Sequence, residues 1–168
     1  MAGMVGTGTG RSEKMEAGKF GGWEVRRPGS CVVGKGKFNL TNKIKSARDL
    51  EVYKLAFAAV MEIFYITKSF PAEEKYSLTD QIRRASRSVC SNLGEAWRKR
   101  RYRAVFVNKL TDSQQEASET QTWLNFCLAC EYINSITFSD LDRKYEQILG
   151  MLNSMEIKAD KFCFPKER

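Results

Sequence analysis

Apolar residues recur at helical spacing in four separate stretches of the chain. The first stretch runs from about residue 49 to 68, and Pro71 ends it because the residue before a proline avoids helical angles. The pattern predicts three further helices, from near Ser77 to about residue 98, from about 102 to 133, and from Ser139 to about 161. Short connections between long helices favour an all-α fold, an antiparallel up-down-up-down four-helix bundle.

Two of these predicted helices begin at residues whose side chains are suited to cap a helix N-terminus. Ser77 precedes the second helix, and Asp80 follows it at the spacing of a capping box. Ser139 and Asp140 precede the apolar pattern of the fourth helix, with Asp142 three residues after the serine. We therefore expect these residues to mark the two helix starts.

The chain divides into parts of different composition. Residues 1–47 hold ten of the twelve glycines and lack an apolar period, so we expect a disordered, basic, Gly-rich tail. The predicted bundle covers residues 48–163, and residues 164–168 form a short C-terminal tail after it. The N-terminal part carries a net charge of +6, against +2 for the rest of the chain, so the formal charge of +8 lies mostly in the tail. This tail is either a nucleic-acid-binding arm or an inert extension from a misplaced start codon.

The composition argues against a catalyst. The chain contains no histidine, which rules out Ser-His-Asp, Cys-His and His-metal sites, and it lacks the glycine-rich nucleotide-binding motifs. Cys127 and Cys130 form a C-x-x-C, but no second pair of ligands accompanies them. We expect no metal, no cofactor and no enzymatic activity, with free cysteines in a reducing cytoplasm. No apolar run reaches the length of a membrane span, so no membrane partner is expected.

Polar residues also line the inner side of the second and third predicted helices. Their spacing places them along one face of each helix, and hairpin geometry sets position n roughly opposite position 200 minus n. The sequence predicts a buried or half-buried polar seam in which Arg84 pairs with Glu116 or Glu119. Such a seam is either a network that specifies register, a subunit interface, or a ligand site. Its residues are Arg84, Ser88, Asn92, Glu95, Glu116 and Glu119.

A dense group of cations follows the second predicted helix into the next turn. Trp97 and Tyr102 bracket the densest part, where aromatic rings would stack on bases. Arginine predominates, and its planar fork suits phosphate contacts. The group indicates a nucleic-acid-binding surface, a docking surface for an acidic protein, or a solvated turn. The candidate nucleic-acid-binding residues are Arg83, Arg87, Arg98, Lys99, Arg100, Arg101 and Arg103.

Several motifs of the chain together resemble one known family. They are Asp49–Ala56, Phe70-Pro71, Gln81–Ser86, Gly94–Arg100 and Glu119–Leu124. They resemble the four-helix-bundle proteins encoded in intervening sequences of 23S rRNA, over about residues 48–163. This family is similar to the accessory protein of diversity-generating retroelements, a pentameric barrel that binds nucleic acid and a reverse transcriptase. The resemblance implies a homopentamer with a positively charged face, and RNA, DNA or a reverse transcriptase as partner.

Two functions therefore stand as predictions. The first is a non-enzymatic homo-oligomer that binds nucleic acid through its basic surface. The second is a scaffold that docks a protein such as a reverse transcriptase without touching nucleic acid itself. Self-association is expected in both, because aromatic residues such as Phe57, Phe64, Trp123 and Phe126 exceed one narrow core stripe.

Overall fold

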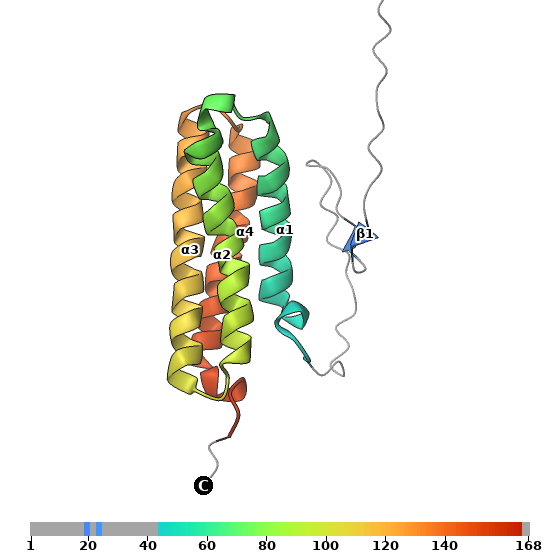
Figure 1. Cartoon of the computed structure of the whole chain (residues 1–168), viewed down its shortest axis with the longest axis vertical. Coiled ribbons are helices and arrows are strands. Elements are labelled where there is room, and N and C mark those ends of the chain that lie inside the picture. Colours follow the sequence, from blue (N-terminus) through green and yellow to red (C-terminus); the bar gives the residue numbers. More distant parts are fainter. Residues whose placement is uncertain (1–18, 21–22, 25–43, 166–168) are drawn as a thin grey trace, which may run out of the picture. The chain divides into compact units, whose positions relative to one another are not determined.

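The computed structural model describes residues 19–20, 23–24 and 44–165. The last of these ranges forms an all-α four-helix bundle, as the apolar periodicity predicts (Figure 1). Its helices are α1 (Glu51–Ile66), α2 (Leu78–Arg98), α3 (Arg103–Ala129) and α4 (Ser135–Ile157).

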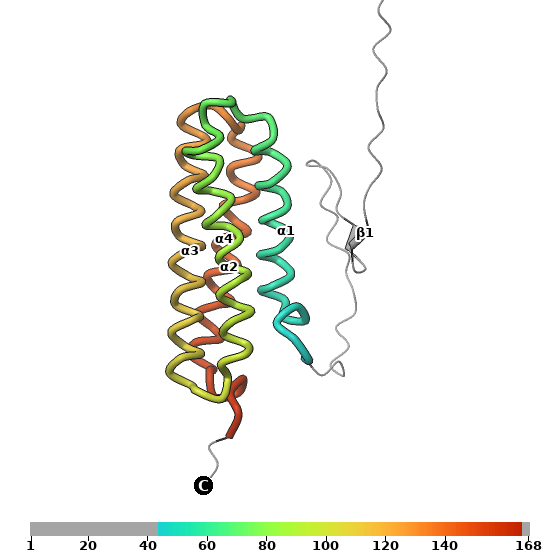
Figure 2. The backbone as a smooth tube through the Cα atoms, viewed as in Figure 1, coloured from blue at the N-terminus to red at the C-terminus, as the bar shows by residue number. Residues whose placement is uncertain are grey.

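Consecutive helices run in opposite directions, and the tube in Figure 2 follows this up-down course. Helix α1 packs against α2 and α4, and α3 packs against the same two helices, so α1 lies diagonally across from α3. The α2–α3 turn and the C-terminal end of α4 therefore lie at one end of the bundle, with the other two connections at the opposite end (Figure 1).

Shorter elements flank the four helices. The described residues include the 3-10 helices η1 (Ala47–Asp49), η2 (Thr67–Ser69), η3 (Ala72–Tyr76) and η4 (Ala159–Lys161). Two strands of two residues, β1 (Lys19–Phe20) and β2 (Trp23–Glu24), pair antiparallel. The rest of the predicted tail, up to residue 43, lies outside the described residues. None of the described helices combines the length and the apolar character that crossing a membrane requires.

The core consists of the apolar stripes of all four helices. Ile63 of α1, Ile82 of α2, Leu124 of α3 and Leu152 of α4 are fully buried. The Ser113 hydroxyl, also fully buried, donates a hydrogen bond to the Val89 carbonyl oxygen at 3.1 Å. This bond joins α2 to α3 close to the register that hairpin geometry predicts.

The third helix ends earlier than its apolar pattern predicts. Cys130 is its C-cap, and Glu131 adopts a positive φ of 59°. The Tyr132 amide then donates to the Cys127 carbonyl at 2.9 Å, and the Glu131 amide donates to that of Leu128 at 3.0 Å. These two bonds form a Schellman motif, which closes a helix whether or not apolar residues follow. Here a glutamate occupies the left-handed position that usually holds glycine.

Ser77 is the N-cap residue of α2, as predicted, but its side chain does not cap the helix. At α2, the Ser77 hydroxyl donates to the Glu74 carboxylate, and the Leu78 amide donates to the same carboxylate at 3.2 Å. Hydrogen bonds from Ser77, Leu78 and Tyr132 to this carboxylate hold the pKa of Glu74 below its ordinary value. Glu74 therefore caps α2 from the preceding 3-10 helix, a position that the capping-box spacing does not include.

Helix α4 begins four residues before the predicted Ser139. The Asn134 side-chain oxygen accepts a hydrogen bond from the Thr137 amide at 2.8 Å, which is the geometry of an N-cap. The first turn of α4 includes Ile136, which is 74% exposed. Because this turn does not follow the buried stripe, hydrophobic periodicity misses it.

We expect Asn134→Ala to lower the free energy of unfolding by about 1 kcal/mol, because it removes this cap. Ser139→Ala is the matched control, since Ser139 is exposed on α4 and alanine has the higher helix propensity. Urea unfolding followed by circular dichroism measures both effects. An equal loss from the two substitutions would contradict the observed start of α4.

Candidate nucleic-acid interface

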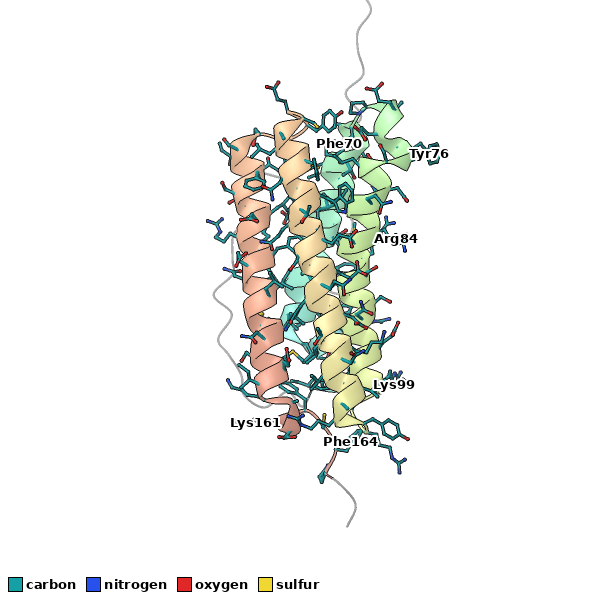
Figure 3. The ribbon with its side chains drawn as sticks, turned by 90° about the vertical axis from the view of Figure 1, so that its left-hand side faces the viewer. Phe70, Tyr76, Arg84, Lys99, Lys161 and Phe164 are labelled. Carbon is teal, nitrogen blue, oxygen red and sulfur yellow. The ribbon has the colours of Figure 1, made fainter. Side chains whose placement is uncertain are left out.

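The α2–α3 turn presents cations at one end of the bundle. Arg98 is the last residue of α2 and Lys99 its C-cap, where positive charge complements the helix dipole. Both side chains are exposed and form no ion pair with another described residue, and Arg101 is exposed beside them. Figure 3 shows Lys99 at the same end of the bundle as Phe164. These three exposed residues form the part of the predicted basic group that lies at the turn.

Arg100 points back toward the chain's own C-terminal segment. Its guanidinium lies 3.5 Å from the centre of the Trp97 ring and 5.0 Å from that of Phe164. Its Nε donates to the Trp97 carbonyl at 2.8 Å, and its own carbonyl accepts from the Phe164 amide at 3.3 Å. Partial burial lowers the pKa of Arg100 from its ordinary value. Arg100 thus serves as a packing group between two aromatic side chains.

Arg103 also contacts the C-terminal segment. Its Nε lies 2.6 Å from the Asp160 carboxylate, and both side chains are largely exposed. Such a surface ion pair contributes little to stability, but it neutralises the cation locally. Arg100 and Arg103, both among the predicted phosphate-binding residues, therefore already have partners within the chain. Neither Asp160 nor Phe164 carries a local sequence signal for this contact.

Arg83 and Arg87 lie on the side of α2 that faces α1. The Nε of Arg83 donates to the Thr67 hydroxyl at 2.7 Å, and its guanidinium lies 5.2 Å from the centre of the Phe64 ring. Arg87 is exposed one turn further along. At a rise of 1.5 Å per residue, Arg83 lies roughly 22 Å from Arg98 along the helix axis. The predicted residues thus form a line along α2 that leads to the turn.

The polar seam between α2 and α3 is present only in part. Ser88, Asn92, Glu116 and Glu119 are half-buried, as predicted for such a seam, whereas Arg84 is exposed. Figure 3 shows Arg84 on the outer side of α2. It forms no ion pair with the carboxylates of Glu116 or Glu119, so the predicted buried pair is wrong. The spacing places Arg84 on the seam side of α2, but its long side chain extends to solvent.

The carboxylates of Glu116 and Glu119 are surrounded mainly by groups other than Arg84. Desolvation and then the nearby Glu119 raise the pKa of Glu116, an effect that the positive charge of Arg84 opposes from a distance. Glu119 instead accepts a hydrogen bond from the Trp123 indole at 3.1 Å.

Glu95, which is also exposed, is bridged to helix α3. The Lys109 ammonium lies 3.0 Å from the Glu95 carboxylate and 3.1 Å from that of Asp112. Both contacts with carboxylates raise the pKa of Lys109. This bridge was absent from the predicted seam, although Lys109 lies close to Glu95 in the hairpin register. The seam therefore joins α2 to α3 through Lys109, where the sequence suggested Arg84.

The fold and the site define a class: an all-α bundle with arginines along α2 and a basic end at the α2–α3 turn. The chain belongs to the 23S rRNA-intervening sequence protein family, whose model matches residues 48–154. A crystal structure of a protein of unknown function from the S23 ribosomal protein family of Bacteroides thetaiotaomicron is similar to it. That structure has 28% sequence identity and a TM-score of 0.57, and the match covers 62% of this chain and 97% of that one. No curated protein matched the chain.

Proposed function

We propose that this protein is a non-enzymatic, homo-oligomeric bundle that binds nucleic acid through the basic surface of α2 and the α2–α3 turn. The observation that carries the proposal is the exposed group Arg98, Lys99 and Arg101 at one end of the bundle. Cations gathered in this way displace the counterions condensed on phosphates, which supplies sequence-independent affinity. The family is named after an intervening sequence of 23S rRNA, so a structured RNA is a suitable first ligand to test.

Self-association belongs to the same proposal. Val105 on α3 is 40% exposed and Ile136 on α4 is 74% exposed, and they lie on different helices at opposite ends of the bundle. Large apolar side chains exposed at separate places favour contacts with further copies of the chain. A pentamer is the assembly that the family resemblance implies. Sedimentation equilibrium tests it, and a mass equal to one chain would refute any oligomer.

The decisive experiment is a binding titration of the full chain with a structured RNA across a series of salt concentrations. We expect the logarithm of affinity to fall linearly with the logarithm of salt, with a slope of about −0.9 for each phosphate contact on a duplex. The measurement is fluorescence anisotropy of a labelled RNA. Absence of binding at low salt would refute the nucleic-acid function and favour a scaffold that docks a protein partner, such as a reverse transcriptase, on the same surface.

A further inference from the structure

The outer face of α1 beside α2 carries a stripe of large apolar side chains. Tyr53, Phe57, Met61 and Phe64 follow at spacings of four, four and three residues, so they lie along one side of the helix. The rings of Tyr53 and Phe57 are nearly parallel, at 10°, with centroids 6.5 Å apart. All four side chains are at least partly open to solvent. The stripe is therefore a row of accessible apolar surfaces roughly 16 Å long, from the helical rise.

Cations lie beside this stripe at both of its ends. The Lys68 ammonium and the Arg83 guanidinium lie 4.8 Å and 5.2 Å from the centre of the Phe64 ring. Arg48 lies beside the Tyr53 hydroxyl at the other end. Because α2 runs antiparallel to α1, Arg87 falls between the levels of Phe64 and Tyr53, on the α2 side of the stripe.

The acidic groups of α1 and α2 leave this face positive. The Glu51 carboxylate pairs with Lys54 at 2.6 Å, and that of Glu62 pairs with Lys144 of α4 at 2.5 Å, on the opposite side of α1. On α2, Asp80 precedes Arg83 by three residues and lies on the same side. Asp80 on α2 and Asp49, next to Arg48 in the sequence, are thus carboxylates near a face that carries four cations: Arg48, Lys68, Arg83 and Arg87.

We propose that the α1–α2 face binds a single strand of nucleic acid, with bases stacked on the α1 rings and phosphates on the α2 arginines. Unpaired bases stack on aromatic side chains while cations follow the backbone, and this face offers both in parallel rows. The distance from Arg83 to Arg98 accommodates about six nucleotides at the 3.4 Å rise of a stacked strand. The inference rests on the proposed function and specifies which form of nucleic acid this face takes.

A duplex would use the protein differently. Its bases are already stacked on one another, so it presents phosphates to the cations at the α2–α3 turn and gains nothing from the α1 rings. A second copy of the chain would also cover the stripe, but the cations beside it would then need carboxylates from that copy. The charge of the face therefore favours a polyanion over a second basic chain.

The test compares Phe57→Ala with the full-length wild type on two probes. One probe is a fluorescein-labelled, unstructured RNA strand of 12 nucleotides, and the other is the same strand annealed to its complement. We expect the variant to bind the single strand at least about fivefold more weakly and the duplex within about twofold of wild type. Phe57→Tyr retains an aromatic ring and is expected to restore single-strand affinity.

Phe126→Ala is the matched control, because Phe126 is a similarly exposed phenylalanine on the diagonally opposite helix. It is expected to leave both affinities unchanged. Unchanged single-strand affinity for Phe57→Ala overturns the inference, and an accompanying fall in sedimentation mass would assign the face to self-association. Binding of both probes by wild type with no effect of Phe57 leaves the proposed function standing. Binding of neither probe refutes the proposed function itself.

Discussion

Replacing Arg98 and Lys99 together by alanine is expected to weaken RNA binding about 10- to 30-fold at roughly 0.15 M salt. Each cation that contacts a phosphate contributes close to one unit to the salt slope, so the slope of log affinity against log salt becomes shallower by about two. Both side chains are exposed at the end of α2, so their loss leaves the core intact. Fluorescence anisotropy across a salt series measures affinity and slope together.

The matched control is Lys75→Ala with Arg143→Ala, which removes the same charge at the opposite end of the bundle. Lys75 lies over the Tyr76 ring and Arg143 pairs with Asp140 at 2.5 Å, so neither belongs to the α2–α3 turn. Long-range electrostatics alone would weaken binding equally in the two double variants. Equal effects would therefore contradict the prediction that the turn is the contact surface.

The largest effect on stability is expected from Phe106→Ala, at about 3–5 kcal/mol. Phe106 is fully buried near the start of α3, and its ring packs against Phe162 with centroids 6.2 Å apart. The substitution removes a large apolar side chain and leaves a cavity between α3 and the C-terminal segment. Chemical denaturation at fixed protein concentration gives the change in the free energy of unfolding.

Phe126→Ala is the control on the same helix. Phe126 is 51% exposed, so the same substitution is expected to cost less than about 1 kcal/mol. Similar costs at the two positions would mean that α3 is rotated from the orientation described. The pair therefore tests directly which side of α3 faces the core.

The C-terminal segment contacts two of the cations at the α2–α3 end of the bundle. Phe164 packs near Arg100, and Asp160 pairs with Arg103, so the cations that remain exposed without a described ion pair include Arg98 and Lys99. This is why the double substitution targets those two residues. A count of arginines along the sequence overstates the charge that this end offers to a ligand.

Most of the fold follows from the sequence alone. The helical period of apolar residues places α1 to α4, because each helix must bury one stripe and a stripe of this period fits only a helix. Short connections then dictate antiparallel packing, and the turn between α2 and α3 predicts the register that the Ser113–Val89 hydrogen bond shows. Helix ends are less well predicted, since Glu74 and Asn134 cap α2 and α4 from positions outside the apolar pattern.

The candidate site depended far more on tertiary structure. The cations are visible in the sequence, but their surroundings come from residues distant along the chain, as with Arg103 and Asp160 or Arg83 and Thr67. The aromatic stripe of α1 is likewise a candidate binding surface only because the arginines of α2 lie beside it. Periodicity describes how one helix meets the core, because burial repeats with the helical turn. Contacts between the outer edges of neighbouring helices have no such repeat, so only the packed structure decides them.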